Sequence, residues 1–406
     1  MKFTELEFIP VILGGDITAY SLARSFNEQY NVKCVAISLN KNGMTSYSKF
    51  IDNRICPDME KTEVFIRTLQ EIGVEFSEKK LILLACGDWY VRMIIENRDK
   101  FGENYIIPYI GLDLLDKLVL KDSFYGICEE LNVPYPNTFV YDVKEDTQLN
   151  LPFDYPVIAK PASSALYHFA KFEGKRKIFK FKDEASLAKM LDNLKASEYN
   201  YKFLIQDFIP GDDTNMRILT CYCDRESKVK FAAFGRVLLE DHGPMAIGNP
   251  IAIINDTDVD IVNHAARFLE HVGYRGFANF DLKHDSRDNS VRFFEINARL
   301  GRSNYYITGS GFNAVKWIVD DLVYNKELEY VIADSKNLYT VVPKSVILDY
   351  VKDEQIRCEV EKLYKKKKIA NPLYYKNDMT LFRRLYCRLF MYRQKKKYNM
   401  YKNAEN

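Results

Sequence analysis

The chain of 406 residues lacks several features that would assign a class at once. Its eight cysteines form no C-x-x-C pair, and no internal repeat or low-complexity tract occurs. Scattered cysteines without metal-ligand spacing predict free thiols in a reducing compartment. Residues 1–7 are largely polar and charged, and no apolar run of membrane length follows them. We therefore expect neither a signal peptide nor a transmembrane helix, and a cytoplasmic location.

An excess of one charge is also missing. The 58 Lys and Arg residues nearly balance the 56 Asp and Glu residues, which gives a net charge of +2. A protein that binds nucleic acid through phosphate contacts carries a larger basic excess, so no nucleic-acid partner is expected. Hydrophobic residues make up 47% and charged residues 28%, which is typical of a soluble globular protein. The length predicts more than one core.

The first 111 residues alternate strand and helix patterns, which predicts an open parallel α/β sheet. The expected strands are 8–13, 32–39 and 80–86, and the expected helices are 19–26, 64–72 and 91–95. Gly14-Gly15 lacks the full G-x-G-x-x-G spacing, so we expect no dinucleotide site there. Asp16 and Asp88 follow two of the strands. They are weak candidates for contact with a substrate, because ligands of such sheets lie near the carboxyl ends of strands.

Residues 112–330 have a mixed α+β pattern. One helix is expected to run from Asp113, its N-cap, to Leu131, because Pro134 follows shortly after. Strands with polar turns between them come next, interrupted by further helical patterns. The expected strands are 155–160, 201–209, 217–222 and 229–238, and the expected helices are 186–193, 258–273 and 313–323.

Two strands joined across a polar turn, 284–290, carry the most specific polar residues. Asp281 lies on the first strand, and Glu295 and Asn297 lie two residues apart on the second, so they share a face. Two carboxylates and an amide form an oxygen-rich site suited to Mg²⁺. Arg299 continues the same face beside the metal. A hairpin edge with ordinary polar residues on its wet face is the alternative.

The last part of the chain, 331–406, is expected to be a C-terminal extension with a basic amphipathic helix. Apolar residues recur at helical spacing at positions 381, 382, 385, 386, 389 and 390, with arginines beside them and a lysine run at 395–397. Such a helix can lie on an anionic membrane surface through 381–397, at the inner face of the membrane. Alternatively, it packs on the protein core with its basic face in water.

The order of these signals resembles the ATP-grasp carboxylate–amine ligases. A lysine heads a helix that ends in Val-Pro, a second lysine closes Tyr155-Pro-Val-Ile-Ala-Lys160, and a strand runs into Ile209-Pro-Gly-Asp-Asp213. Asp281 and Glu295-x-Asn297 complete the series. The resemblance covers about 112–323. It implies an ATP-grasp domain of two lobes at 112–330, a pre-ATP-grasp α/β domain at 1–111, and ATP and Mg²⁺ as cofactors.

The resemblance also implies a role for each matching residue. Lys121, thirteen residues before Pro134, matches the first nucleotide-binding lysine, with Lys117 as the alternative, and Lys160 matches the second. Such ammonium groups would offset the charge of the triphosphate during phosphoryl transfer. Arg299 resembles the catalytic cation near the transferred phosphate. The remaining matches are the adenine-binding segment with Gln206, Asp207 and Ile209, the ribose-binding Asp213, and the Mg²⁺ ligands Asp281, Glu295 and Asn297.

One segment departs from the family pattern. Many ATP-grasp enzymes carry a glycine-rich loop over the phosphates, whereas residues 161–173 contain no glycine and the next one is Gly174. Serine hydroxyls and backbone N–H groups could still cover phosphate there. The role of the segment 161–175 is therefore open, and His168, Lys171 and Lys175 are interpreted as ordinary polar loop residues.

Within the family, the chain is most similar to the D-aspartate ligases of peptidoglycan assembly. The segments that carry this similarity include 7–16, 85–88, 107–110 and 172–175. It implies that ATP activates D-aspartate as an acyl phosphate, which the side-chain amine of a lysine in a peptidoglycan precursor then attacks. Positions on the same sheets and loops suggest that four residues bind the acceptor: Arg217, Arg236, Arg302 and Ser303.

Two alternatives stay open. The first is an ATP-grasp ligase for another amino acid, or for another cell-envelope or secondary-metabolite acceptor, since a few pocket residues can change the substrate accepted. The second is a nucleotide-binding module without catalysis. The intact set Asp281, Glu295 and Asn297 argues against this module, because binding alone does not need all three ligands.

Overall fold

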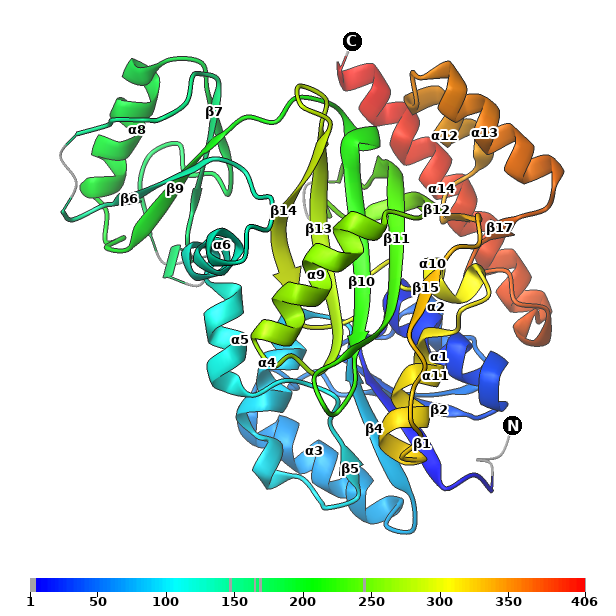
Figure 1. Cartoon of the computed structure of the whole chain (residues 1–406). Helices are drawn as coiled ribbons and strands as arrows, with labels where there is room; N and C mark the ends of the chain where they lie inside the picture. The colour runs from blue at the N-terminus through cyan, green and yellow to red at the C-terminus, as the bar shows by residue number, and fades with distance from the viewer. Residues whose placement is uncertain (1–4, 146–147, 164–165, 168–169, 244–245, 406) are drawn as a thin grey trace. The chain divides into compact units, whose positions relative to one another are not determined.

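The computed structural model describes residues 5–145, 148–163, 166–167, 170–243 and 246–405. It divides into two compact units, and the chain passes between them more than once. The larger unit is made of Met1–Leu112, Met216–Asn279 and Asn297–Asn406. The smaller unit is made of Asp113–Asn215 and Phe280–Ile296. The elements and their labels are shown in Figure 1.

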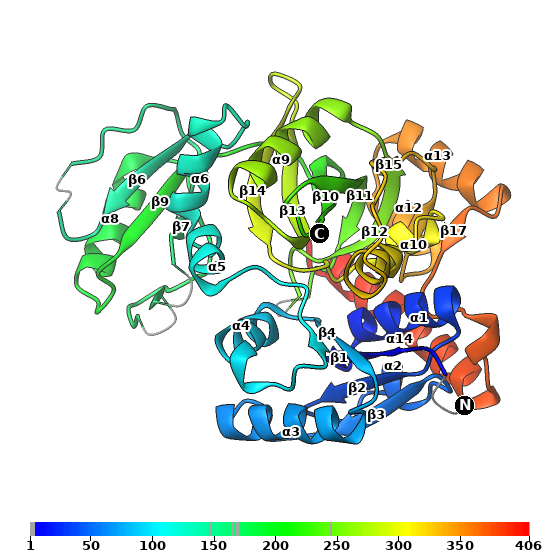
Figure 2. The same cartoon turned by 60° about the horizontal axis from the view of Figure 1, so that its bottom comes forward.

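The larger unit begins with a five-stranded sheet in which every neighbouring pair is parallel, in the order β3-β2-β1-β4-β5. Figure 2 shows α1 and α3 on opposite faces of this sheet. The three inner strands, β2, β1 and β4, are buried on both sides, which explains their nearly continuous apolar sequence, whereas the edge strand β3 is only partly buried. The elements are β1 (Phe8–Leu13), α1 (Ile17–Tyr30), β2 (Cys34–Ser38), α2 (Gly43–Ser46), β3 (Ile51–Ile55), α3 (Thr62–Glu75), β4 (Lys80–Ala85), α4 (Asp88–Glu96) and β5 (Tyr105–Ile106).

The smaller unit contains a four-stranded antiparallel sheet in the order β6-β9-β7-β8. The helix α8 covers it, and Leu187 and Leu191 of α8 share a buried cluster with Phe203 and Ile205 of β9. The elements are α5 (Leu112–Val119), α6 (Lys121–Glu130), β6 (Thr138–Asp142), β7 (Val157–Pro161), β8 (Phe179–Phe181), α8 (Glu184–Lys195) and β9 (Lys202–Asp207).

The second large sheet has the order β14-β13-β10-β11-β12-β16-β17, and β15 pairs with β11. The strands are β10 (Met216–Cys223), β11 (Val229–Glu240), β12 (Pro250–Asp256), β13 (Gly276–Asp285), β14 (Ser290–Asn297), β15 (Val331–Ala333), β16 (Leu338–Thr340) and β17 (Ile369–Ala370). The helices are α9 (Val259–His271), α10 (Tyr305–Gly309), α11 (Ala314–Ile318), α12 (Lys344–Tyr350), α13 (Glu354–Lys365) and α14 (Leu381–Glu405).

Most expected elements are present, and the expected open parallel α/β sheet and the mixed α+β part are confirmed. The single helix expected from Asp113 to Leu131 is wrong. It is two helices, because Leu120 between them is extended (φ −74°, ψ 114°) and Asp113 lies in the first turn of α5 instead of capping it. The break makes Lys121 the first residue of α6. The domain boundaries 1–111, 112–330 and 331–406 stay a prediction.

All eight cysteines are free, and five of them are buried: Cys34, Cys128, Cys221, Cys223 and Cys387. This confirms the expected free thiols. Within the described part of the chain, no helix is both long and apolar enough to cross a membrane.

Candidate active site

The hairpin of β13 and β14 carries the three residues expected to hold a metal. Asp281 lies on β13, and Glu295 and Asn297 lie on the neighbouring edge strand β14. Ile296 between them is buried, whereas Glu295 and Asn297 are partly exposed. Because side chains alternate along a strand, the carboxylate and the amide share the open face of β14.

Two lysines of the smaller unit act on Glu295. The Nζ atom of Lys121 lies 3.3 Å from a carboxylate oxygen of Glu295, and the side chain of Lys121 is largely buried. Lys160 of β7 also acts on this carboxylate through its charge. Loss of water works to raise the pKa of Glu295, but the charges of Lys121 and Lys160 outweigh it and lower the pKa overall. Glu295 is therefore held as a carboxylate.

Asp281 and Glu295 also lie within hydrogen-bonding reach of each other. Two carboxylates in contact repel each other when both are ionised, and a bound cation relieves that repulsion. In the described residues, no group of three or more His, Cys, Asp or Glu side chains is placed to hold a metal. A metal role for Asp281, Glu295 and Asn297 therefore stays a prediction, which rests on an all-oxygen donor set of the kind that Mg²⁺ prefers.

Lys160 lies against aromatic side chains. Its Nζ is 5.7 Å from the ring centroid of Tyr125 and 5.6 Å from that of Phe294, and it donates a 3.3 Å hydrogen bond to the Tyr125 hydroxyl. The Tyr125 hydroxyl in turn donates to the carbonyl of Phe294 at 2.8 Å. Loss of water lowers the pKa of Lys160 to about 8, although the charge of Glu295 acts in the opposite direction. Tyr125 thus positions Lys160, a role that no pattern in the sequence indicated.

The segment expected to bind adenine begins at the end of β9, with Gln206 and Asp207 as the last two residues of that strand. The buried Gln206 donates from its amide to the Thr138 hydroxyl at 2.7 Å and also hydrogen-bonds Tyr125, while Ile209 is buried. Asp213 begins a short 3-10 helix (Asp213–Asn215) and is partly exposed. The structure thus brings Gln206 close to the Lys160 environment through Tyr125. Nucleotide contacts of Gln206, Asp207, Ile209 and Asp213 stay a prediction.

Arg287, in the turn between β13 and β14, was not expected to matter. It forms two hydrogen bonds with Asp207, of 2.9 and 2.7 Å, and also binds the fully buried Asp285 at 2.6 Å. The Arg287 contacts lower the pKa of Asp285 to about 2. A cleft of about 270 Å³ lies beside this pair, lined in part by Phe153, Tyr155 and Phe208.

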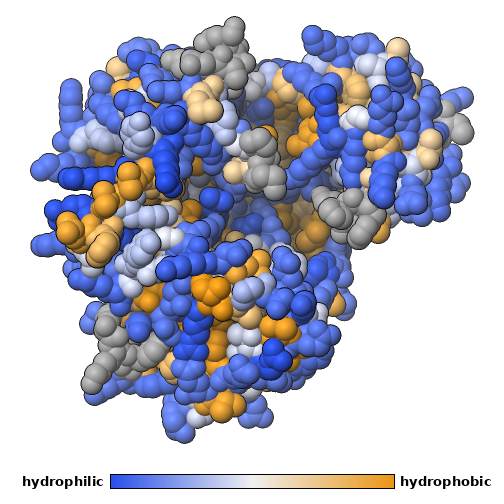
Figure 3. Space-filling view, turned by 180° about the vertical axis from the view of Figure 1, so that it is seen from behind, coloured by the Kyte–Doolittle hydropathy of each residue, from blue (hydrophilic) through white to orange (hydrophobic). Residues whose placement is uncertain are grey.

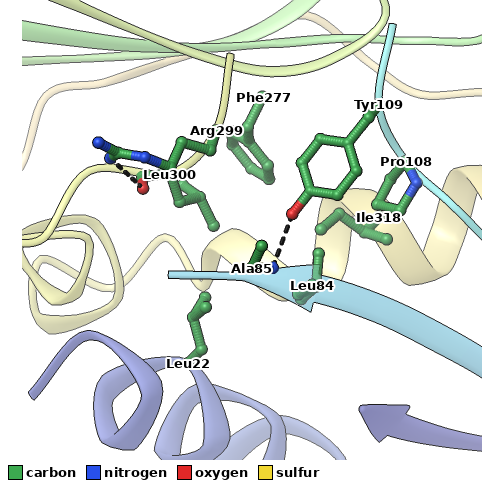
Figure 4. Close-up of a pocket in the computed structure, with 9 residues that line it drawn as sticks. All are labelled: Leu22, Leu84, Ala85, Pro108, Tyr109, Phe277, Arg299, Leu300 and Ile318. Atoms are coloured by element: carbon green, nitrogen blue, oxygen red, sulfur yellow. Dashed lines mark hydrogen bonds between the residues drawn. The ribbon is translucent and has the colours of Figure 1, made fainter. Parts of the chain in front are cut away.

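In the larger unit, Arg299 is paired with Asp88. Its guanidinium donates two hydrogen bonds to the Asp88 carboxylate, of 2.7 and 2.9 Å. The Arg299 side chain is 15% exposed, whereas that of Asp88 is 66% exposed. Figure 4 shows the guanidinium directed away from a small apolar cavity that the stem of Arg299 helps to line. At about 10 Å³ this cavity is too small for a substrate and is a packing gap.

The other weak candidate of the parallel sheet, Asp16, is also placed next to an arginine. Its carboxylate caps α1 by accepting from the N–H groups of Thr18 and Ala19, and it lies 3.7 Å from Arg302. β1 and β4 are neighbours, so the ends of two adjacent strands each hold an arginine from the segment after β14. The sequence analysis named both acids and both arginines as candidates, but it did not predict that they pair with each other.

The other residues suggested for the acceptor are placed differently. Arg217 and Arg236 are directly opposite each other on β10 and β11. Loss of water, and next the charge of Arg236, lower the pKa of Arg217 to about 10, and Glu359 of α13 pairs with Arg236. Ser303 is buried. Acceptor binding by these residues stays a prediction.

Lys117, the alternative to Lys121, is exposed on α5, whereas Lys121 contacts Glu295. In the segment 161–175, the hydroxyl of Ser163 accepts from the N–H of Leu166 at 3.3 Å. Lys175 donates to the carbonyl of Ala170 at 2.7 Å, so it is tied to its own loop. Lys171 is exposed. The remaining residue named for this loop, His168, lies outside the described residues, as do positions 164, 165 and 169.

Comparison with known proteins finds a relative that aligns with nearly the full length of this chain. No family model matches the chain. A D-aspartate ligase of Enterococcus faecium (strain Aus0004) is 37% identical over 391 residues, which cover 93% of this chain and 92% of that protein.

Solved structures match the fold at low sequence identity. The biotin carboxylase domain of the Hydrogenobacter thermophilus 2-oxoglutarate carboxylase, in complex with MgADP, ADP and bicarbonate, has a TM-score of 0.60 and 14% identity. The match covers 82% of this chain and 74% of that one. An L-amino acid ligase from Bacillus licheniformis has a TM-score of 0.54 and 13% identity, with 78% and 73% covered. At these identities the likeness shows the fold alone.

Proposed function

Because this chain belongs to the ATP-grasp ligases, which form carbon–nitrogen bonds with ATP, we propose that it joins D-aspartate to the lysine side-chain amine of a peptidoglycan precursor. The fold class expected from the sequence, an ATP-grasp fold behind an open parallel α/β sheet, is confirmed. The similarity to D-aspartate ligase over nearly the whole chain supports the choice of substrates.

The observation that carries the proposal is the cluster of Lys121, Lys160 and Glu295. Two ammonium groups converge on one ionised carboxylate that also contacts Asp281. A triphosphate that enters this cluster meets two cations, and these cations stabilise the charge that shifts to the leaving diphosphate. Tyr125 holds Lys160 in this place.

A solved structure with this fold, the Hydrogenobacter thermophilus biotin carboxylase domain, holds MgADP. In this chain Asp281, Glu295 and Asn297 would hold the Mg²⁺ ion, and the ion would neutralise phosphate charge when bound. The contact between the two carboxylates supports this assignment, because a dication would compensate their charges.

The proposed reaction has two steps. A carboxylate oxygen of the amino acid attacks the γ-phosphorus of ATP, so that a new O–P bond forms and ADP leaves. The acceptor amine then attacks the acyl carbon, loses a proton and expels phosphate, which leaves an amide. Arg299 is proposed to stabilise the acyl phosphate. In the structure its charge is balanced by Asp88.

ADP release with D-aspartate or L-aspartate, each with and without a peptidoglycan precursor, tests the substrates. We expect ADP formation to need D-aspartate and ATP, and amide formation to need the precursor as well. Equal rates with both stereoisomers, or ADP formation with neither, would contradict the choice of acid.

A ligase for another amino acid is the second candidate. The likeness to an L-amino acid ligase supports it at the level of fold. Phosphate release measured across D- and L-amino acids separates the two. If an acid other than D-aspartate gives the highest kcat/KM, the ligase assignment stands and the substrate changes.

A nucleotide-binding module without catalysis is the third candidate, and ATP binding without any amino-acid-dependent ADP formation would support it. Glu295→Ala tests the metal role of Glu295 in the proposed ligase. We expect this change to abolish ligase turnover while ATP binding is largely kept, because the carboxylate holds the metal rather than the adenine. Glu198→Ala, which removes an exposed carboxylate of the same unit, should leave turnover unchanged. If Glu295→Ala turns over like the original protein, the metal role of Glu295 is wrong.

A cytoplasmic location is part of the proposal, since ATP is the proposed substrate. No nucleic-acid partner is included. A contact of 381–397 with a membrane, which the sequence suggested, would involve none of the candidate active-site residues.

A further inference from the structure

The C-terminal helix α14 is fixed to the larger unit along one side by apolar and polar contacts together. Arg383 is fully buried, stacks on the Tyr20 ring at 3.8 Å, donates to the carbonyl of Met44 and lies 3.8 Å from Asp378. Further along, the hydroxyl of Tyr398 donates to the carbonyl of Glu240 at 3.0 Å. The helix is therefore held along its length, and these contacts determine which of its faces is turned towards the larger unit.

The opposite face of α14 is apolar and exposed. Leu381 is 81% exposed, Phe382 76% and Leu385 56%, and Leu389 and Tyr392 continue the row. Positions 381, 385, 389 and 392 follow the spacing of one helical stripe. The stripe was expected to pack on the core if the helix did not bind a membrane. That alternative is wrong for Leu381, Phe382, Leu385 and Leu389, which are exposed, whereas Tyr386 and Phe390 of the expected stripe do pack against the core.

Positive charge borders this stripe. Arg384, Arg388, Arg393, Lys395 and Lys396 are all exposed. No acidic residue occurs from Met379 to Ala404. Among the described residues these five cations have no ion pair, whereas Lys397, on the inner side of the helix, binds Asp241. The exposed face thus combines apolar side chains with uncompensated positive charge. Figure 3 shows one face of the molecule, on which apolar side chains gather in groups among hydrophilic ones.

We propose that the outer face of α14 binds an anionic lipid surface. The apolar stripe would enter the boundary between head groups and acyl chains, and the cations would contact the anionic head groups. A helix without acidic residues, with leucine and phenylalanine between arginines, complements that chemistry. The proposal does not depend on which substrates the ligase uses, because no residue of the candidate active site takes part.

Sedimentation of the full-length protein with vesicles tests the proposal. We expect binding to vesicles of phosphatidylcholine with 30% phosphatidylglycerol, weaker binding when salt is raised, and little binding to phosphatidylcholine alone. If the protein stays in the supernatant with both vesicle types, the proposal is overturned.

Two pairs of variants separate the apolar from the electrostatic contribution. Leu385→Gln with Leu389→Gln removes apolar contact without changing charge, and should weaken binding at least tenfold. Arg384→Gln with Arg388→Gln should weaken it about fivefold for each charge removed and should lower the salt dependence. Retained binding in both pairs would overturn the proposal.

Matched controls keep the result specific. Val74→Gln changes an apolar side chain of α3 that is 77% exposed, and Lys182→Gln with Lys189→Gln removes two exposed charges of the smaller unit. All of these control variants should bind vesicles like the original protein. Because every changed side chain is exposed, the melting temperature should be unaffected. If the original protein is instead a dimer that Leu385→Gln with Leu389→Gln dissociates, the stripe contacts a second copy and the lipid proposal fails.

Discussion

Lys160 is placed so that its charge depends on pH near the neutral range. Contact with Tyr125 and Phe294 removes it from water, and its pKa falls to about 8. Below this value the ammonium is charged, and as pH rises through about 8 the charge is lost. We therefore expect ATP affinity to fall by about tenfold per pH unit above the pKa, measured by titration calorimetry.

A conservative variant tests this cause. Lys160→Arg stays charged throughout the accessible pH range, so the decrease above pH 8 should disappear. Lys160→Met should give weak binding at every pH. A decrease that persists unchanged in Lys160→Arg would assign the titration to another group.

Arg287 stabilises the smaller unit through Asp285. Arg287→Ala removes the main partner of a buried carboxylate, so the free energy of unfolding in urea should fall by about 2 kcal/mol at pH 7. Because the pKa of Asp285 is lowered from its ordinary value to about 2, this stabilisation is complete above about pH 4. The difference between the two proteins should shrink as pH falls from 4 towards 2.

Arg67→Ala is the control, since Arg67 is exposed and its nearest acid, Glu71, is 3.9 Å away. Its effect should stay below about 0.5 kcal/mol at all pH values. A difference for Arg287→Ala that does not depend on pH would mean that packing, not the charge of Asp285, is lost.

At the residue level, the sequence predicted which side chains belong to the candidate site better than it predicted which residues those side chains contact. Lys121, Lys160 and Glu295 could be selected because their spacing follows a family pattern, and the structure brings them together. Arg287 and Tyr125 could not be selected, since their partners lie far away in sequence and depend on the folded arrangement.

Among the elements, β13 begins at a glycine beside which there is no room for a Cβ atom. Gly276 has φ +83°, and a Cβ there would lie 2.3 Å from the carbonyl oxygen of Pro108. Gly276→Ala should therefore combine backbone strain with a clash against backbone, and should lower the free energy of unfolding by about 3 kcal/mol.

Gly248→Ala isolates the strain, because Gly248 has φ +85° and open space around it. Its cost should be about 1 kcal/mol. Equal melting temperatures for the two variants would show that the chain near Pro108 relaxes and that the clash does not determine stability.

The elements were predictable where their apolar period was regular. β1 and α1 follow their expected positions, whereas the helix expected from Asp113 to Leu131 is broken at Leu120. No proline or glycine marks that break, so the sequence pattern alone reads as one helix. For α14 the period was clear, but the side that contacts the core could not be predicted, because the buried Arg383 replaces an apolar residue there.

For the whole molecule, nucleotide binding should raise the free energy of unfolding. Mg·ATP at about one hundred times its Kd should add about 2.7 kcal/mol to the free energy of unfolding. We expect a higher melting temperature with Mg·ATP than with ATP and a chelator, and Glu295→Ala should remove that difference. An equal shift with and without magnesium would contradict a metal held by Glu295.

The family could be predicted from the sequence because its signals occur in a fixed order over most of the chain. The acceptor could not be predicted from motifs, because the residues that would bind it belong to separate segments with no common sequence pattern. Arg302 pairs with Asp16, and Arg217 faces Arg236. These partners are known only from the fold.

The division of the chain has a practical consequence for making fragments. The smaller unit takes its residues from 113–215 and 280–296, and the larger unit contains both chain ends. Shortening the protein from either terminus therefore removes the larger unit first and never isolates the lysines from their surroundings. An independent nucleotide-binding fragment would require a permuted gene in which residues 280–296 are joined directly to 113–215.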